Sequence, residues 1–342
     1  MLADSYLYQL NPFAIQLTES IGLRWYGLAY IAGFVTGWLI LRWMGKKKIS
    51  PLRPEQAGDL LFTIILGVLI GGRIGYGLFY DQAMFYTFTS SAPWWEALAI
   101  HHGGMSSHGG IVGVLVVVLY WGRKHNIPRL HLLDVCSFCA APGLFFGRLA
   151  NFVNAELWGK ALPIDMQSSP PWWSVKYPVE ITENWIINPT LYAYELSAIE
   201  PLRSSIVGGS FYPNLVAQAQ AGNQTVVETI RPLLTAWYPS QLFQAVTDGP
   251  ILFIAIVLVW WKPRKPGVVA SWFLVVYGIS RIVTEVFRQP DVGVNTILGL
   301  SRGQFLSVFM IIFGLTLALL CARRSVEKLG GFQKGIRSQV AS

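Results

Sequence analysis

The sequence predicts an all-α polytopic membrane protein with about seven transmembrane helices, a small external head, an N-terminus outside and a C-terminus in the cytoplasm. Three observations support this prediction. Of the 342 residues, 53% are hydrophobic and only 13% are charged, about half the charged share of a typical soluble domain. The apolar residues gather in long stretches, and the basic residues gather in the loops between alternate stretches.

Seven apolar stretches are candidates for spans, since a helix needs about 20 mostly apolar residues to cross the hydrocarbon core. A helix satisfies its own backbone hydrogen bonds and is therefore the expected spanning structure. The third stretch is short and begins with glycines. The predicted spans are residues 22–42, 57–79, 108–122, 132–153, 241–261, 268–287 and 303–322.

The orientation follows from lysine and arginine, which favour cytoplasmic loops. Sixteen of the 26 basic residues lie in three alternate loops and the tail: Arg42, Lys46, Lys47, Lys48, Arg53, Arg123, Lys124, Arg129, Lys262, Arg264, Lys265, Arg323, Arg324, Lys328, Lys334 and Arg337. This distribution explains the net charge of +8 without a nucleic-acid partner. Residues 1–21 lack both the basic start and the apolar core of a cleavable signal peptide, so we expect the first span to direct insertion.

The chain divides into four predicted parts. Residues 1–155 hold the first four spans, and residues 239–322 hold the last three. Between them, residues 156–238 are polar and are predicted to form the head, whose fold the pattern does not reveal. Residues 323–342 form a basic tail.

Three arginines lie within or at the outer ends of predicted spans: Arg73, Arg148 and Arg281. An arginine at the centre of a membrane helix costs about 2.5–3.5 kcal/mol on insertion scales, so such residues usually face the protein interior. They could reach outer headgroups or form structural ion pairs, and Glu285 lies one turn after Arg281. Three arginines at similar depth on different helices favour a shared site for an anion.

The stretch GRLANFVNAELWG, residues 147–159, is unusually polar for the end of a span. At about 100° per residue, Arg148, Asn151 and Asn154 fall on one face of a helix. Glu156 does not share that face, so either the helix ends near Asn154 or Glu156 makes a separate contact. The asparagines could bind phosphate or glycerol oxygens, or could join helices by hydrogen bonds.

HHGGMSSHGG, residues 101–110, precedes the third span on the same predicted side. His108 could cap the helix, or act as a base, because its ordinary pKa is close to neutrality. A zinc site from His101, His102 and His108 lacks a further ligand at suitable spacing, so no metal is expected. Ser106 and Ser107 beside His108 raise the alternative of a hydrolase or acyltransferase.

These segments together resemble the bacterial prolipoprotein diacylglyceryl transferases over nearly the whole chain. The resemblance rests on GRLANFVNAELWG and on six further motifs in the order of that family: RWYGLAY (24–30), GGRIGYGLFY (71–80), HGGMSSHGG (102–110), PSQLFQ (239–244), YGISRIVTEVFRQPD (277–291) and RGQFLS (302–307). The chain departs from the family at Tyr238, where histidine is usual, and at Gln244, where glutamate is common. Its head is also longer.

The resemblance implies transfer of the diacylglyceryl group of phosphatidylglycerol to the lipobox cysteine of a preprolipoprotein that still carries its signal peptide. It implies a thioether product, release of glycerol 1-phosphate, no cofactor and a place in the bacterial inner membrane with the active site toward the outer side. The expected catalytic residues are His108, Arg281, Tyr26 and Tyr277, with Arg281 or a tyrosine as alternatives to His108 for activating the thiol. The expected substrate-binding residues are Arg148, Asn151, Asn154, Glu156, Gly159 and Arg73.

A transporter or lipid flippase is the rival from another class, because it would also place arginines inside a bundle. Such proteins are expected to contain repeated halves with broken helices. The sequence has no such repeat.

Overall fold

The computed structural model describes residues 4–11, 13–16, 22–206, 209–289 and 297–333. The chain is mostly helical and forms two compact units, which are described separately. The first unit comprises Met1–Ala32, Leu144–Pro250 and Gly278–Val308. The second comprises Gly33–Gly143, Ile251–Tyr277 and Phe309–Ser342.

Within the described ranges, six helices are long and apolar enough to cross a membrane. They are α1 (Trp25–Lys46), α2 (Gln56–Phe79), α4 (Arg129–Val153), the combined helix Ser240–Trp260, α11 (Val268–Glu285) and α12 (Arg302–Arg323). Each falls on a predicted span, and the chain is accordingly a multi-pass membrane protein. The predicted third span is also helical, as α3 (Ser107–Lys124), but it is not one of these six. The count of seven spans therefore stays a prediction.

The combined helix Ser240–Trp260 changes its hydrogen-bonding pattern midway. It consists of α9 (Ser240–Val246), the π-helical turn η6 (Thr247–Ile251) and α10 (Leu252–Trp260). Pro250 lies in the π turn and has no backbone N–H to donate, so regular α-helical bonding is interrupted there.

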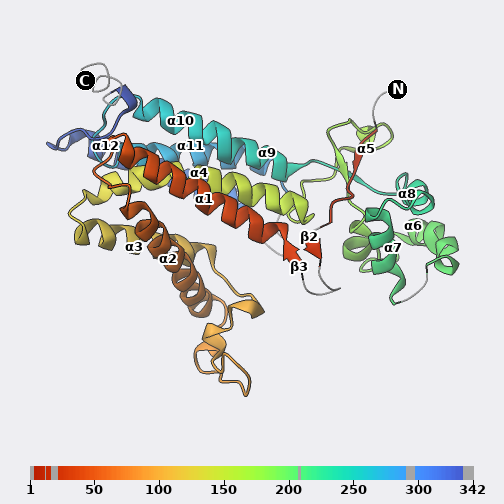
Figure 1. Ribbon diagram of the computed structural model, residues 1–342. Coiled ribbons are helices and arrows are strands. Elements are labelled where there is room, and N and C mark those ends of the chain that lie inside the picture. Colours follow the sequence, from red (N-terminus) through yellow and green to blue (C-terminus); the bar gives the residue numbers. More distant parts are fainter. Residues whose placement is uncertain (1–3, 12, 17–21, 207–208, 290–296, 334–342) are drawn as a thin grey trace. The chain divides into compact units, whose positions relative to one another are not determined.

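In the second unit, α2 and α3 lie side by side along a seam of glycines (Figure 1). A Cβ atom added to Gly71 would lie 2.4 Å from the carbonyl oxygen of Gly109. A Cβ atom on Gly113 would lie 2.0 Å from the carbonyl oxygen of Gly67. The glycines that recur every four residues in the second span thus permit close approach of the two helices.

Three short 3-10 turns, η1 (Gln82–Phe85), η2 (Glu96–Leu98) and η3 (Ile100–His102), lie in the connection between α2 and α3. After α12, the chain returns to the start of α11: the backbones of Arg264 and Leu329 exchange two hydrogen bonds. Phe332 packs there against Trp43, Phe138 and Trp261.

The first unit contains two small sheets that the all-α prediction did not include. β1 (Tyr6–Leu7) pairs in parallel with β4 (Val175–Lys176), which pairs antiparallel with β5 (Ala236–Trp237). β2 (Phe13–Gln16) and β3 (Gly22–Arg24) form an antiparallel pair. Strand β1 therefore joins the N-terminal segment to the head.

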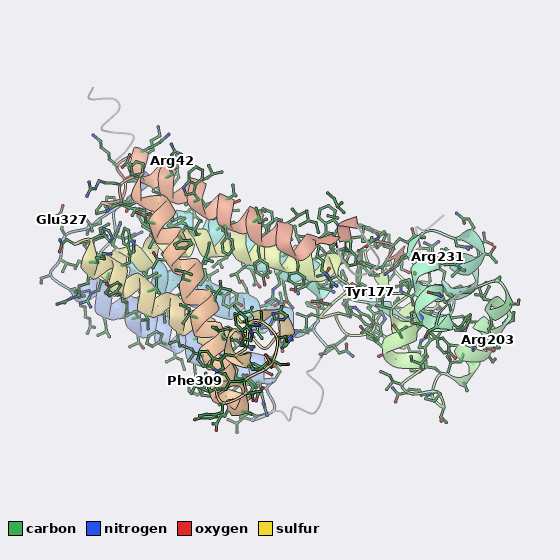
Figure 2. All side chains as sticks on the ribbon, turned by 60° about the horizontal axis from the view of Figure 1, so that its bottom comes forward. Arg42, Tyr177, Arg203, Arg231, Phe309 and Glu327 are labelled. Carbon is green, nitrogen blue, oxygen red and sulfur yellow. The ribbon has the colours of Figure 1, made fainter. Side chains whose placement is uncertain are left out.

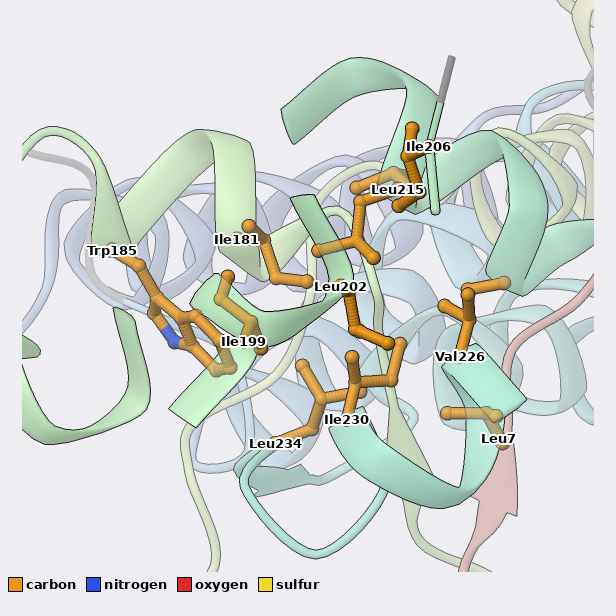
Figure 3. Close-up of a cluster of buried hydrophobic side chains, with 12 residues drawn as sticks. Leu7, Ile181, Trp185, Ile199, Leu202, Ile206, Leu215, Val226, Ile230 and Leu234 are labelled. Atoms are coloured by element: carbon orange, nitrogen blue, oxygen red, sulfur yellow. The ribbon is translucent and has the colours of Figure 1, made fainter. Parts of the chain in front are cut away.

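The head is largely helical and has its own apolar core (Figure 3). Its helical elements are α5 (Ile164–Gln167), the π turn η4 (Ile181–Trp185), α6 (Ala193–Ile199), the 3-10 turn η5 (Glu200–Ser204), α7 (Phe211–Gln220) and α8 (Gln224–Ile230). Trp185 and Ile199 are fully buried in this core, and Leu7 reaches it from β1. Arg203 and Arg231 lie among the helices of the head, where they pair with Glu200 and Asp4 (Figure 2).

A buried carboxylate, Glu180, joins the helical part of the head to its sheet. It accepts hydrogen bonds from the indole N–H groups of Trp185 and Trp237, at 3.3 and 3.1 Å, and from the backbone and hydroxyl of Thr235. Burial raises the pKa of Glu180, while these hydrogen bonds act in the opposite direction. The four donors compensate the carboxylate for its loss of water.

Candidate active site

The polar stretch at the end of α4 folds back on itself. The helix ends at Val153, and the backbone N–H of Asn154 still donates to the carbonyl of Ala150. Ala155 and Leu157 then adopt positive φ angles of 52° and 54°, which reverse the chain. The N–H of Glu156 consequently donates to the carbonyl of Asn151 at 2.9 Å. This confirms the expectation that the helix ends near Asn154.

The reversal brings Glu156 to the first turn of α1. The Tyr26 hydroxyl donates to the Glu156 carboxylate at 3.1 Å, and the side-chain amide of Asn151 donates to the same hydroxyl. Arg148 lies within electrostatic reach of Tyr26. Gln241 of α9 holds the backbone carbonyl of Glu156 at 2.7 Å. Tyr26, Asn151 and Glu156, predicted separately, thus form one hydrogen-bonded group.

Arg148 has a partner that the sequence analysis missed. Its Nε atom lies 3.2 Å from Oδ2 of Asp248, which is fully buried in the π turn η6. Arg281 also lies near enough to act electrostatically on Asp248. The Thr-Asp-Gly-Pro sequence at 247–250, inside an otherwise apolar span, was the available signal. A charged residue within a membrane helix marks a functional or pairing position.

Arg281 belongs to a second group of charges at the end of α11. Its guanidinium lies 2.9 Å from Glu285, so the ion pair considered from the sequence is present. Glu285 also lies 3.7 Å from Arg288 and accepts a hydrogen bond from the Ser301 hydroxyl at 3.0 Å. Gln244, buried in α9, lies 3.4 Å from the other terminal nitrogen of Arg281. Arg281 is therefore held by two helices, and its side chain is 15% exposed.

Gly159 ties the polar stretch to the end of α11 through the backbone. Its N–H donates to the carbonyl of Tyr238, and the next N–H, of Lys160, donates to the carbonyl of Phe287. A Cβ atom on Gly159 would lie 2.3 Å from the Tyr238 oxygen and 2.7 Å from the Phe287 oxygen. Only glycine fits between the backbone segments at Tyr238 and Phe287, which gives a physical reason for the glycine at this position of the motif.

Asn154, directly after α4, carries a side-chain acceptor that the described residues do not use. Its side-chain oxygen is buried and has no hydrogen-bond partner within the described part of the chain. A buried, unpaired amide oxygen costs free energy, so a donor supplied by a substrate would stabilise it.

The remaining predicted residues, Arg73, His108 and Tyr277, belong to the second unit. Arg73 is buried and donates to four carbonyl oxygens, those of Glu96, Ala97, Gly103 and Gly104. It thereby fixes the loop that leads to α3. His108 is exposed at the start of α3, and Tyr277 stacks on Phe273 with ring centroids 6.0 Å apart.

Ser106, one of the two serines beside His108, has a structural task. It is buried, and its hydroxyl accepts from the N–H of Gly109 at 3.2 Å. This is the usual N-cap contact of a helix, and it fixes the first turn of α3.

The geometry of the first unit defines a class. Arginines from α4 and α11, placed next to membrane-spanning segments and held by buried carboxylates and amides, are suited to bind an anionic group beside the bilayer. Tyrosine, asparagine and glutamate side chains adjoin them. These features define a polytopic membrane protein with a candidate site for an anionic group.

Comparison with known sequences identifies the family. The prolipoprotein diacylglyceryl transferase profile matches residues 12–320. A phosphatidylglycerol–prolipoprotein diacylglyceryl transferase of Bdellovibrio bacteriovorus is 36% identical, over 96% of this chain and 97% of the relative. Enzymes of the same description from Ruegeria pomeroyi and Geobacter sulfurreducens are 34% and 32% identical over at least 92% of this chain. The chain belongs to the prolipoprotein diacylglyceryl transferase family and is a transferase of lipoprotein maturation, as the motifs predicted.

Proposed function

We propose that this chain transfers the diacylglyceryl group of phosphatidylglycerol to the lipobox cysteine of a preprolipoprotein. The cysteine sulfur forms a bond to the terminal glycerol carbon of the diacylglyceryl group while the bond from that carbon to the phosphate oxygen breaks. The thiol proton passes to a base, and glycerol 1-phosphate leaves. The observation that carries this proposal is the pairing of Arg148 with Asp248, near Arg281, within membrane helices.

The arginines suit the leaving group. Negative charge grows on the phosphate as the carbon–oxygen bond breaks, and guanidinium groups already oriented by protein partners stabilise that charge without reorganising. Arg148 is oriented by Asp248, and Arg281 by Glu285 and Gln244. Asn151 and Asn154 are suited to the glycerol and phosphate oxygens.

The base is proposed to be His108, which is exposed at the start of α3, directly after the loop that Arg73 fixes. A cysteine thiol has an ordinary pKa of about 8.5 and reacts as the thiolate, so a neutral imidazole nearby would raise the reactive fraction. Tyr26 and Tyr277 are proposed to position the substrates. We also propose that the chain lies in the bacterial inner membrane with seven spans, the N-terminus and head outside, and the site toward the outer face.

The direct test is mass spectrometry of a lipobox-cysteine peptide incubated with the purified protein and phosphatidylglycerol. We expect one diacylglyceryl group on the cysteine and an equal amount of glycerol phosphate. A peptide with serine in place of the cysteine should remain unmodified. No adduct on the cysteine peptide, with phosphatidylglycerol still bound, would contradict the proposed reaction and support a lipid carrier.

The role of His108 is tested with His108→Gln, and Ser107→Ala is the matched neighbour. His108→Gln should abolish transfer and leave phosphatidylglycerol binding intact. Near-normal turnover in His108→Gln would remove His108 as the base. Loss of turnover in both variants would instead favour a serine–histidine mechanism.

A further inference from the structure

Together with the residue on either side of it, α10 presents an apolar stripe that the protein leaves exposed. Ile251, Ile254, Leu258 and Trp261 are separated by three, four and three residues, which places them on one face of the helix. All four are exposed, and Leu258 and Trp261 are 65% and 47% exposed. Since α10 belongs to a membrane span, this stripe faces lipid.

A hollow of about 420 Å³ lies at the end of this stripe, lined by Leu258, Trp261, Lys262 and Arg264. Its lining combines two apolar side chains, Leu258 and Trp261, with two basic ones, Lys262 and Arg264. The Arg264 guanidinium is anchored there, because its Nε donates to the carbonyl of Val259 at 2.7 Å. The Arg264 backbone is fixed as well, by its two hydrogen bonds to Leu329 of the returning C-terminal segment.

The basic groups of the hollow have capacity left. Neither Lys262 nor Arg264 forms an ion pair with a residue in the described ranges, and the described hydrogen bonds of Arg264 use only Nε of its guanidinium. The neighbouring Lys265 differs, because its Nζ donates to the carbonyl of Ala322 at 2.7 Å. Two basic residues thus line the hollow without an ion-pair partner in the described ranges, together with an aromatic ring and an aliphatic side chain.

We propose that this hollow is a binding site for an anionic phospholipid, separate from the donor lipid of the transfer reaction. Its phosphate lies between Lys262 and Arg264, its glycerol backbone lies against Trp261, and one acyl chain follows Leu258 and Ile254 along α10. Charge complementarity selects an anionic headgroup, and the apolar stripe selects a molecule that carries a chain. Tryptophan beside basic residues at the end of a membrane helix matches the level of the headgroups.

The test uses native mass spectrometry of the full-length protein with phosphatidylserine and phosphatidylcholine of identical chains. Phosphatidylserine is not the proposed donor, and variants of the hollow leave Arg148 and Arg281 unchanged, so a loss of binding in them belongs to the hollow. Near an anionic bilayer each basic residue contributes about fivefold in affinity, so Lys262→Gln with Arg264→Gln should weaken phosphatidylserine binding roughly thirtyfold. Phosphatidylcholine binding should not change.

The matched control is Lys46→Gln with Lys47→Gln, which removes the same charge from another exposed basic segment at the end of α1. We expect it to keep phosphatidylserine binding; an equal loss would show non-specific attraction and overturn the site. Leu258→Ser keeps the charges and should also weaken binding, because it removes the apolar wall. Full displacement of phosphatidylserine by soluble glycerol phosphate would reveal an anion site without a chain and would overturn the lipid proposal.

Thermal unfolding distinguishes a loss of binding from misfolding in the variant Lys262→Gln with Arg264→Gln. Wild-type melting should shift upward with added phosphatidylserine, since a ligand that binds only the folded state stabilises it. The Lys262→Gln, Arg264→Gln variant should melt like lipid-free wild type and lose this upward shift. The same shift in the variant as in wild type would overturn the proposal.

Discussion

Replacing Asp248 by asparagine keeps the volume of the side chain but removes the negative charge that faces Arg148. Asp248 is fully buried, and its carboxylate lies 3.2 Å from the guanidinium, whose side chain is 18% exposed. Asparagine still offers one oxygen to Arg148. It leaves the arginine charge without compensation in a site largely removed from water.

Removing one partner of a buried ion pair typically costs about 3–5 kcal/mol. The partial exposure of Arg148 and the remaining amide oxygen both reduce this cost, so we expect a loss of about 2–3 kcal/mol in unfolding free energy. The same substitution should strengthen the binding of phosphatidylglycerol although it weakens the fold. Arg148 without its carboxylate attracts phosphate more strongly, so the KM for phosphatidylglycerol should fall.

The assay combines thermal unfolding with initial rates of peptide lipidation at varied phosphatidylglycerol. Arg148→Gln and the double variant with Asp248→Asn complete a thermodynamic cycle, in which the double variant should be more stable than the sum of the single losses predicts. Arg148→Gln should raise KM. If both single variants lower stability equally and leave KM unchanged, the pair is purely structural and the reasoning about phosphate fails.

Three further predictions concern other parts of the chain. Gly159→Ala forces a Cβ atom against two backbone oxygens, which should lower the unfolding free energy by about 1–3 kcal/mol in thermal unfolding and reduce transfer. Gly147→Ala is the control: a Cβ atom there would have nothing within 4 Å, so the unfolding free energy should not fall. Arg73→Lys cannot reach four carbonyls, so residues 96–104 should exchange amide hydrogens faster in mass spectrometry, and unchanged exchange would show that the loop holds itself. Glu180→Gln places an amide N–H against the buried N–H and hydroxyl donors that Glu180 now accepts from, and it should lower the unfolding free energy by about 1–3 kcal/mol. Because burial raises the folded pKa of Glu180, its contribution to stability is largest at low pH and is lost as pH rises through that pKa. The melting temperature of the wild type should therefore fall between about pH 4 and pH 7, and that of the variant should fall less.

The membrane helices could be predicted closely because their signal is local. The stretch 57–79 became Gln56–Phe79, and 132–153 became Arg129–Val153. An apolar run of sufficient length forms a helix in lipid whatever its neighbours are. The third stretch was harder to assign as a membrane span, since the glycines that bring α3 against α2 also lower its apolar character.

The fold of the head could not be predicted from the sequence, because its strands and core combine segments that are far apart in the chain. Its sheet takes β1 from the first residues of the chain and pairs Tyr6 with Val175. Its core takes Leu7 from the same strand. Contacts so far apart in sequence leave no periodic pattern in either segment, and the strands involved are two residues long.

The candidate site lies between these extremes. Tyr26, Asn151 and Glu156 were found because they belong to short motifs, whereas their hydrogen bonds could not be foreseen. Glu156 reaches Tyr26 across a turn at Ala155, whose positive φ angle is one that non-glycine residues rarely adopt.

The pairing of Arg148 with Asp248 depends on the residues that follow Asp248. Pro250 interrupts the α-helical bonding, and the π turn η6 forms in its place. Gly249 lets α4 approach closely, because a Cβ atom there would lie 2.7 Å from Cβ of Phe145. Arg148 lies one turn after Phe145, so the same approach that seats the phenylalanine on Gly249 carries the guanidinium to Asp248. The glycine and the proline, which bear no charge, therefore place the charged pair.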